Sequence, residues 1–370
     1  MKLLCKKSDL LQGVNIVLKA VPSKTTMSIL ECILIDASTN DIKFTANDME
    51  LGIETKIEGQ IIEKGIIAID AKVFSDIIRK LPDNDVTITV DEDLKMTITC
   101  EKAKFSILGK SGDDFSYLPY IEKEKYIVLS QFTLKEVIRQ TLFSVADNDS
   151  NKLMTGELFE VAENELKVVA LDGHRIAIRT IDLKKEFEAV KVVVPGKTLN
   201  EVSKILTGGT EDDVKIFFTS NHIVFEFDQT VVVSRLIEGE YFKINQMLSS
   251  DYETKIEINR QELLDCIDRS TLLIKEGNVK PIIINITDEH MELKMTSFIG
   301  TMNEEIDIKK EGKDIMIGFN PKFLIDALRV IDDEVVKIYL VNPKAPCFIR
   351  DDEGRYTYLV LPVSFNITNN

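Results

Sequence analysis

The sequence predicts an α+β protein made of three similar domains, and three observations support this. First, the 370-residue chain is longer than one hydrophobic core usually serves, so two or three domains are expected. Second, a helical segment recurs twice more at a spacing of 125 residues. Third, each copy is followed by an acidic turn and by alternating apolar and polar residues, a pattern typical of antiparallel strands.

The recurring helical segments begin at Ala71, Gly196 and Pro321 and read AKVFSDIIRKL, GKTLNEVSKIL and PKFLIDALRVI. They align without gaps, and the equivalent apolar positions are Phe74, Leu199 and Leu324; Ile77, Val202 and Ala327; and Leu81, Leu206 and Ile331. Apolar residues at i, i+3 and i+7 form one face of an amphipathic helix. A period this long indicates three similar domains rather than a solenoid, whose repeats run to roughly 20–50 residues.

A second set of helical patterns precedes the first and starts near Leu10, Leu134 and Leu263. A two-strand unit follows each of these, so the chain reads as three copies of helix, strands, helix, strands. The segments 120–129 and 249–258 look like linkers. We therefore predict domains at residues 1–125, 126–250 and 251–370.

The composition is that of a globular protein, with 44% hydrophobic and 29% charged residues. No run approaches the 18 or so apolar residues that a membrane span needs. The first residues, MKLLCKKSDLL, interrupt any apolar stretch that a signal peptide would require. We therefore expect a cytoplasmic protein.

The cysteine and histidine pattern predicts neither disulfides nor a metal site. The five cysteines are an odd number, are widely scattered and form no C-x-x-C pair. This pattern favours buried thiols in a reducing compartment. None of the three histidines has a second ligand at metal-binding spacing, so we expect no metal and no cofactor.

Basic residues recur on the aligned helices although the net charge of the chain is −16. One column holds Lys72, Lys197 and Lys322, and another holds Arg79, Lys204 and Arg329. The two columns are seven residues apart, so they share a stripe roughly opposite the apolar face. Asp76, Glu201 and Asp326 follow the lysines by four residues and predict i, i+4 ion pairs.

Two interpretations of these columns are open. Any amphipathic helix carries charge on its solvated face, which is the usual explanation for one helix. Three helices with the same two basic columns instead favour a shared surface for sequence-independent phosphate contact. The earlier helices are less regular, but Lys19, Lys135, Arg139 and Arg269 fall on their polar faces.

Two short motifs suggest an alternative, a nucleotide-dependent enzyme. The PGKT segment at 195–198 resembles the end of a P-loop, but Lys191 stands where that motif needs glycine, and Pro195 lacks a backbone N–H. In the DGHR segment at 172–175, Asp172 and His174 are two residues apart, so on a strand they would share a face. No nucleophile motif accompanies them, and a tight turn with a structural His–Arg pair is the favoured interpretation.

Four segments resemble the bacterial DNA polymerase III beta subunit, the beta sliding clamp. They are VPSKTTMSILECILI from Val21, LDGHRIAI from Leu171, FNPKFLIDAL from Phe319 and YLVLPV from Tyr358. The resemblance covers essentially the whole chain. It implies three repeated DNA-clamp domains, each with two helices on the inner face and antiparallel sheets outside, in a head-to-tail dimeric ring around duplex DNA.

The resemblance also implies a function and its residues. The chain would be a processivity factor of DNA replication, not an enzyme, that tethers the replicative polymerase. By position, the resemblance implies DNA contacts at Lys24, Lys72 and Lys152, with Lys197 as a further candidate. The basic columns of the repeated helices add Arg79, Lys204, Lys322 and Arg329 as expected DNA-binding residues. A pocket for a short Leu/Phe-containing peptide of the polymerase, the clamp loader or repair proteins would use Met154, Leu171, Gly173, His174, Arg175, Ile176, Phe242, Met247, Asn320, Phe323, Pro346, Val360, Leu361, Pro362 and Val363.

The implied dimer interface pairs one end of the chain with the other end of a second copy. It would bring Phe105, Ile107 and Leu108 against Leu272 and Leu273, with Lys102 and Lys104 facing Glu304 and Glu305. The sequence departs from the family pattern at 240–246, where it reads EYFKINQ, so the pocket floor or rim is expected to differ. Residues 366–370 run past the family's usual end and predict a mobile tail.

Overall fold

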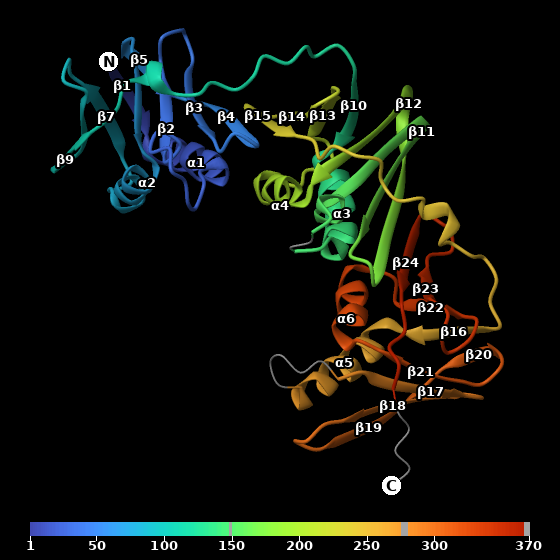
Figure 1. Ribbon diagram of the computed structural model, residues 1–370. Helices are drawn as coiled ribbons and strands as arrows, with labels where there is room; N and C mark the ends of the chain where they lie inside the picture. The colour runs from blue at the N-terminus through green and yellow to red at the C-terminus, as the bar shows by residue number, and fades with distance from the viewer. Residues whose placement is uncertain (148–149, 275–279, 366–370) are drawn as a thin grey trace. The chain divides into compact units, whose positions relative to one another are not determined.

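The computed structural model describes residues 1–147, 150–274 and 280–365, and the tail at 366–370 lies outside this range (Figure 1). The described part of the chain contains six α-helices, two in each predicted repeat. They are α1 (Lys7–Val17), α2 (Ala71–Lys80), α3 (Gln131–Thr141), α4 (Gly196–Ile205), α5 (Arg260–Ser270) and α6 (Pro321–Val330). The starts of α2, α4 and α6 confirm the 125-residue repeat.

The helices begin where the local sequence provides an N-terminal cap. The Asp70 side chain accepts the Val73 N–H at 2.7 Å, and the Asn320 side chain accepts the Lys322 N–H at 3.1 Å. Pro321 occupies the first turn of α6, where its missing N–H costs no helical hydrogen bond. Phe74, a predicted apolar-face residue, is fully buried.

The strands form four sheets, in which all the strand pairs of the described residues are antiparallel. A five-stranded sheet has the order β5 (Gln60–Glu63), β1 (Lys2–Lys6), β7 (Asp85–Val90), β8 (Lys95–Cys100), β9 (Ala103–Leu108). An eight-stranded sheet has the order β10 (Tyr126–Ser130), β13 (Asp213–Phe218), β14 (His222–Phe227), β15 (Thr230–Arg235), β4 (Leu51–Ile57), β3 (Ile42–Asn47), β2 (Cys32–Asp36), β6 (Ile66–Asp70).

The other two sheets are built mainly from the second half of the chain. A seven-stranded sheet has the order β11 (Gly156–Leu171), β12 (Arg175–Pro195), β24 (Tyr356–Val360), β23 (Cys347–Arg350), β22 (Val335–Leu340), β16 (Thr254–Asn259), β20 (Lys309–Gly312). A four-stranded sheet has the order β19 (Thr301–Asp307), β18 (His290–Thr296), β17 (Ile282–Thr287), β21 (Ile315–Phe319). The α+β prediction with antiparallel sheets is confirmed.

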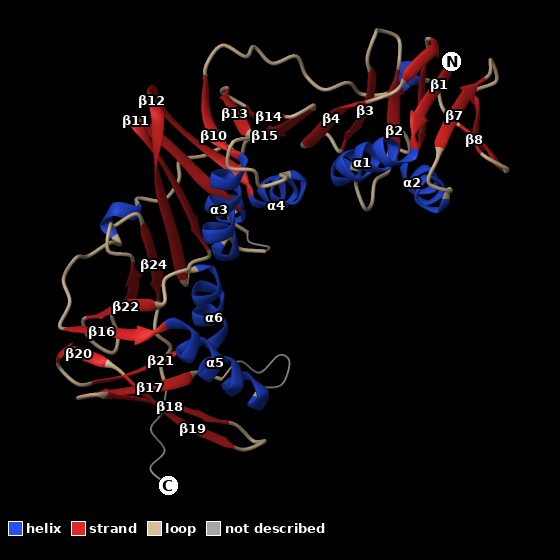
Figure 2. Cartoon of the chain, turned by 180° about the vertical axis from the view of Figure 1, so that it is seen from behind, coloured by secondary structure: helices blue, strands red, loops and turns tan. Residues whose placement is uncertain are grey.

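The chain divides into two compact units, each of which holds two of these sheets. The first comprises Met1–Leu134 and Asn200–Leu236, and the second comprises Lys135–Leu199 and Ile237–Asn370. Within each unit the helices lie on one side of the sheets (Figure 2). The units cut the middle repeat because β15 pairs with β4 and β12 pairs with β24, so a continuous sheet crosses each predicted domain boundary. The boundaries themselves stay a prediction.

Each repeat begins with a strand that the sequence did not reveal. The predicted linkers 120–129 and 249–258 each end in such a strand, since β10 starts at Tyr126 and β16 at Thr254. The interpretation of these stretches wholly as linkers is therefore wrong. Both strands have alternating apolar residues on their buried face. Charged residues such as Lys125 and Glu253 come directly before the strands, so the sequence alone favours interpreting the pattern as part of a linker.

Two backbone features recur in all three repeats. The first is a four-residue turn closed by a hydrogen bond from its first N–H to its last carbonyl. These bonds are Asp48 to Leu51 at 3.0 Å, Asp172 to Arg175 at 3.3 Å and Ser297 to Gly300 at 3.0 Å. The second feature is a crossing. The segment that leads out of each repeat passes over the strand that precedes the second helix of that repeat. Its bonds are Lys110 to Ala68 at 2.8 Å, Ile237 to Val193 at 2.9 Å and Val363 to Gly318 at 2.8 Å.

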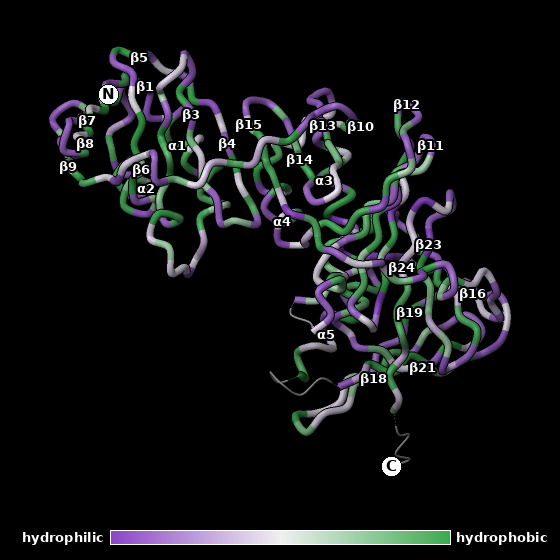
Figure 3. The backbone as a smooth tube through the Cα atoms, turned by 45° about the horizontal axis from the view of Figure 1, so that its top comes forward, coloured by the Kyte–Doolittle hydropathy of each residue, from purple (hydrophilic) through white to green (hydrophobic). Residues whose placement is uncertain are grey.

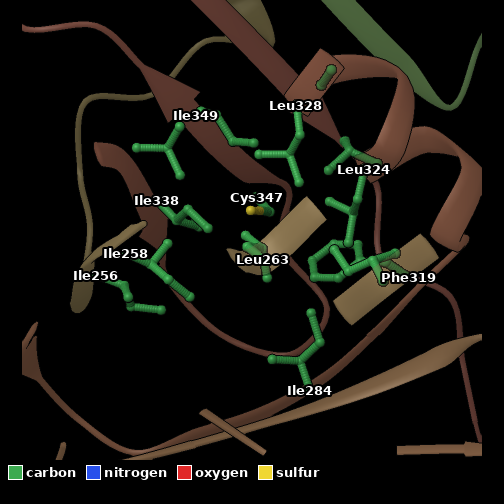
Figure 4. Packing of buried hydrophobic residues seen from close by; sticks show 14 of the residues in the cluster. Ile256, Ile258, Leu263, Ile284, Phe319, Leu324, Leu328, Ile338, Cys347 and Ile349 are labelled. Atoms are coloured by element: carbon green, nitrogen blue, oxygen red, sulfur yellow. The ribbon is translucent and has the colours of Figure 1, made fainter. Parts of the chain in front are cut away.

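The hydrophobic cores lie between the helices and the sheets. In the third repeat, Leu263 of α5 and Leu324 of α6 pack against strand residues such as Ile338 (Figure 4). Hydrophobic residues run along the strands, whereas the turns are largely hydrophilic (Figure 3). All five cysteines are free and buried, which confirms the predicted buried thiols. None of the described helices is long and apolar enough to cross a bilayer.

Candidate nucleic-acid and partner-binding surfaces

The basic residues of the repeated helices all lie on the solvent side. Lys72, Arg79, Lys197, Lys204, Lys322 and Arg329 are exposed, while the residues two positions after each lysine, Phe74, Leu199 and Leu324, are buried. Lys24 and Lys152 are also exposed and lie outside the α-helices. The predicted opposition of a basic and an apolar face is therefore confirmed for each helix by itself.

Each acidic residue on these helices has an ion-pair partner outside the predicted i, i+4 spacing. Asp76 lies 4.0 Å from Arg79, three residues later, and Glu201 lies 2.8 Å from Lys204. Asp326 pairs with the buried Arg175 rather than with Lys322. A lysine placed N-terminal to its acid is the weaker order for an i, i+4 pair, and a buried arginine competes better than a solvated lysine.

The DGHR segment forms a turn whose last residue, Arg175, begins strand β12. Asp172 Oδ1 accepts the backbone N–H groups of His174 at 3.0 Å and Arg175 at 3.1 Å. Its Oδ2 accepts the Arg175 Nε–H at 2.8 Å. The predicted tight turn is confirmed, but the structural pair is Asp172–Arg175, not His174–Arg175. Gly173 has φ +84°, a conformation that L side chains rarely adopt.

Arg175 is the centre of a buried polar cluster within the second unit. Its side chain is 6% exposed and forms ion pairs of 2.8 Å with both Asp172 and Asp326. Its Nη2–H also donates to the Phe143 carbonyl at 2.6 Å. The guanidinium lies 4.5 Å from the centre of the Phe323 ring. One buried cation thus connects the turn, the 3-10 helix Leu142–Ser144 that follows α3, and helix α6.

His174 and the C-terminal segment lie beside this cluster. The His174 ring stacks on Phe323 with centroids 6.0 Å apart. The Leu361 N–H donates to the His174 carbonyl at 2.8 Å, so the segment after β24 follows the turn. Leu361 and Val363 are 38% and 40% exposed, which leaves apolar side chains on the surface.

An apolar cluster continues from this edge along the seven-stranded sheet. Its buried members are Leu158, Val169, Leu171, Ile176, Ile178, Val193, Tyr241, Ile244, Phe348 and Leu359, and half-buried Leu153, Met154, Ile237, Phe242, Leu248 and Tyr339 pack against them. The structure thus brings together four of the predicted pocket residues here: Met154, Leu171, Ile176 and Phe242.

The unusual 240–246 segment anchors itself in this cluster. Tyr241 is 5% exposed, and its hydroxyl donates to the Val169 carbonyl at 3.3 Å. Burial raises the pKa of this phenol above its usual range. Phe242 packs edge-on against Tyr241 with ring centroids 5.4 Å apart and stays half-buried. Met247 is 47% exposed just beyond.

The remaining predicted pocket residues take supporting positions. Asn320 caps α6, and Val360 pairs with Arg175 in the β12–β24 register. Pro346 precedes β23, and Pro362 lies between Leu361 and Val363. The prediction missed Asp172, Asp326 and Phe143 as partners of Arg175 and missed Leu153 and Leu248 in the cluster. Most of these residues are far apart along the chain, so no local sequence pattern indicates that they are in contact. Asp172 could have been identified, because it lies in the same motif as Arg175.

The PGKT segment lacks the loop that a phosphate-binding motif needs. Strand β12 ends at Pro195, and α4 begins at the next residue, Gly196. A Cβ on Gly196 would lie 2.9 Å from the Thr155 carbonyl oxygen, so tight backbone packing explains this glycine. No group of three or more His, Cys, Asp or Glu residues suited to a metal ion occurs in the described part of the chain.

The predicted interface residues lie on two strands at sheet edges and one short helix, except Lys102, which lies in the turn before β9. Phe105, Ile107 and Leu108 belong to β9, where Leu108 is 75% exposed. Leu272 and Leu273 belong to the 3-10 helix η6 (Thr271–Leu273), where Leu272 is 79% exposed. Glu304 of β19 pairs with Arg269 at 2.6 Å, a partner that the sequence did not predict.

One buried residue of the second repeat stands out. Glu157 is 0% exposed, and its two carboxyl oxygens have no hydrogen-bond partner among the described residues. The nearby Thr141 hydroxyl donates instead to the Val137 carbonyl at 2.8 Å. Burial raises the pKa of Glu157 to about 8, although Thr141 acts in the opposite direction. The carboxyl is therefore mainly neutral at pH 7.

Three helix-and-sheet repeats joined edge to edge define a clamp-type protein. Comparison with known proteins identifies the family. The N-terminal, central and C-terminal domain models of the DNA polymerase III beta subunit match residues 1–119, 128–243 and 245–364. The chain belongs to this family, the beta sliding clamps.

Relatives match along their whole length. The beta sliding clamp of Staphylococcus epidermidis is 34% identical over 98% of this chain and 99% of its own. The Bacillus subtilis DNA polymerase sliding clamp structure is 34% identical, with a TM-score of 0.96, over 99% of this chain and 100% of its own. A structure from Eubacterium rectale, described as a candidate DNA polymerase III beta subunit, is 72% identical with a TM-score of 0.96 over the same shares.

Proposed function

We propose that this chain is a non-enzymatic DNA sliding clamp that works in the cytoplasm. Two copies encircle duplex DNA head to tail and tether a replicative polymerase. The observation that carries this proposal is the pairing of sheet edges. Two of the three equivalent edges are joined within the chain, β15 to β4 and β12 to β24. The third pair, β9 and β19, consists of strands that end their sheets.

The repeat predicts the register in which β9 meets β19 of a second copy. Thr230 of β15 corresponds to Ala103 because each follows a two-residue hairpin turn. Thr55 of β4 corresponds to Glu304 because each lies four positions after the last residue of the four-residue turn in its repeat. Transferring the pairs Thr230–Thr55, Val231–Glu54, Val232–Ile53 and Val233–Gly52 gives Ala103–Glu304, Lys104–Asn303, Phe105–Met302 and Ser106–Thr301.

Two further equivalences extend this interface. The Arg235 N–H donates to the Glu50 carbonyl at 2.9 Å, as Leu361 does to His174 at 2.8 Å. The third copy of this bond would run from Leu108 to Ile299 of the second chain. Phe298 and Ile299, in the turn between β18 and β19, are 68% and 47% exposed. Lys102 would then lie opposite Glu305.

Duplex DNA is the proposed ligand of the basic helical columns. The candidate contacts are Lys24, Lys72, Arg79, Lys152, Lys197, Lys204, Lys322 and Arg329. All are exposed, and the excess of acid elsewhere would discourage tight adhesion. A basic lining inside an acidic protein suits a loose, sequence-independent contact with phosphate. Long residence on DNA then comes from topology rather than from affinity.

The surface around His174, Phe242, Phe323 and Leu361 is the proposed partner site. Its exposed and half-buried apolar side chains suit the Leu and Phe anchors of a short linear peptide. The buried Arg175 cluster would keep the site preformed, which lowers the entropic cost of binding. The polymerase, the clamp loader and repair proteins would compete for it.

Retention on DNA tests the ring. The clamp is loaded by its clamp loader onto nicked circular DNA, and the complex is isolated by gel filtration. We expect the clamp to remain on circles and to leave when a restriction enzyme linearises them. Equal retention on linear DNA with open ends would contradict a topological link.

Peptide binding tests the partner site separately. Fluorescence anisotropy of a labelled Gln-Leu-Ala-Leu-Phe peptide should show saturable binding that Leu361→Asp removes. Tyr120→Ala is a matched control, because Tyr120 is 93% exposed and lies outside the proposed site. Binding that survives Leu361→Asp would contradict the proposed location.

A further inference from the structure

The segment that leaves each repeat is held by the same hydrogen bond in three places. It is the crossing bond between Lys110 and Ala68, Ile237 and Val193, and Val363 and Gly318. In the first two repeats this segment continues as the chain into the next repeat. In the third repeat it is the C-terminal segment 361–365, which follows strand β24.

Side-chain sizes at the crossing are reversed in the third repeat. The strand residues are Ala68, Val193 and Gly318, and the residues two positions after the crossing are Gly112, Gly239 and Phe365. The first two crossings thus have a side chain on the strand and a glycine on the segment. The third has a glycine on the strand and a phenylalanine on the segment.

The Phe365 ring lies directly against Gly318. A Cβ on Gly318 would be 2.7 Å from Phe365 Cδ1 and 3.0 Å from the Val363 carbonyl oxygen, closer than van der Waals contact allows. Phe365 is half-buried, whereas Val363 and Ser364 before it are exposed. The ring therefore turns inward while its neighbours face solvent.

We infer that Phe365 and Gly318 form a knob-and-hole anchor that positions the C-terminal segment for partner binding. The anchor acts together with two backbone bonds, Leu361 to His174 and Val363 to Gly318. Phe365 is a positioning residue, since it holds the exposed side chains of Leu361 and Val363 in place from behind. This inference rests on the proposed partner site, and its first readout does not.

The first readout is hydrogen–deuterium exchange of the Val363 amide in the full-length protein without ligand. Phe365→Ala should increase this exchange by roughly tenfold or more, because the segment loses the contact that keeps it closed. Phe365→Leu, which keeps part of the knob, should lie between Phe365→Ala and the unchanged protein. Phe132→Ala is the control, because it removes a phenylalanine that is 48% exposed on α3.

The second readout is binding of the labelled Gln-Leu-Ala-Leu-Phe peptide. Phe365→Ala should weaken it by about tenfold, since peptide binding must then order a free segment. Gly318→Ala should weaken binding similarly by pushing the ring away. Gly318→Ala combined with Phe365→Gly restores the pair found in the first repeat and should lose less than the sum of the two single changes.

The outcomes separate the inference from the proposed function. Unchanged Val363 exchange in Phe365→Ala would overturn the anchor, whatever the peptide does. Weaker binding with unchanged exchange would also overturn it, because the ring would then touch the peptide itself. No peptide binding by the unchanged protein would overturn the partner site but leave the exchange test valid.

Discussion

The two junctions between repeats, β15 with β4 and β12 with β24, have the same backbone hydrogen bonds but different side chains. Both have a four-residue turn, and both receive a hydrogen bond on the third residue of that turn, at Glu50 or at His174. The last turn residue is the fully buried Leu51 in one and Arg175 in the other. The backbone therefore joins repeats in the same way at both junctions, while the last turn residue is apolar in one and charged in the other.

The same comparison applies to the strand before each second helix. Three residues at equivalent positions of the repeats pair with this strand. Ile33 lies opposite Ile69, Glu157 opposite Val194, and Ile282 opposite Phe319. Two of these residues are fully buried isoleucines, and the third is a fully buried carboxyl. Equivalent positions in one fold thus tolerate a neutral polar group, at a cost in stability that depends on pH.

Arg175→Ala should have the largest effect, because it leaves the half-buried Asp172 and Asp326 without their buried cation. Removing one partner of a buried ion pair costs about 3–5 kcal/mol in the free energy of unfolding. Urea denaturation measures it. Arg355→Ala is the matched control, because Arg355 pairs with Glu165 and Asp182 at the surface, and we expect a loss below about 1 kcal/mol. Equal losses would show that the Arg175 cluster is not special.

Glu157→Gln should stabilise the protein at neutral pH. The pKa of Glu157 is raised from 4.5 to about 8, so the folded state holds a proton that the unfolded state releases. Stability is full below pH 4.5 and falls as the pH rises toward 8, by about 3 kcal/mol at pH 7.

The pH profile of urea unfolding separates this effect from general packing. The two proteins should differ little at pH 5 and increasingly from pH 6 to 8. Glu157→Ile, which restores the residue of the other repeats, should also lack the pH dependence. Parallel profiles for Glu157→Gln and the unchanged protein would mean that Glu157 is not the group that titrates.

Leu108→Asp should weaken the proposed dimer, which is the junction that one chain leaves open. A carboxylate at Leu108, at the end of β9, costs about 2 kcal/mol or more at each of the two junctions of the proposed ring, which together is roughly a thousandfold rise in the dimer Kd. Analytical ultracentrifugation measures it. Ile62→Asp changes a 48% exposed residue on β5, the opposite edge of the same sheet, and should leave the Kd unchanged.

Lys197→Ala and Lys322→Ala should have the smallest effects, because each removes one solvated phosphate contact. The slope of log K against log salt for duplex binding should fall by about 0.9 for each lost contact. Lys313→Ala removes a 74% exposed lysine in the turn after β20 and should not change the slope. An equal change in all three would indicate a general charge effect.

The sequence was sufficient for the repeat and for the buried and exposed faces of its helices. Phe74, Leu199 and Leu324 recur every 125 residues because each helix covers its own sheet, and local periodicity records that burial. The strands β10 and β16 were not predicted, because they are short and follow charged stretches. The pocket and interface residues came from family resemblance, and their roles stay predictions.

By itself, then, the sequence determined the helical segments of each repeat, the threefold repeat and the charge of each helical face. Only the tertiary structure decided which distant residues share a site. Arg175 meets Asp326 across 151 positions, and Phe365 meets Gly318 across a crossing that periodicity does not record. Helical and strand periods report burial of one element at a time, whereas contacts between elements depend on strand pairing and packing that no local pattern contains.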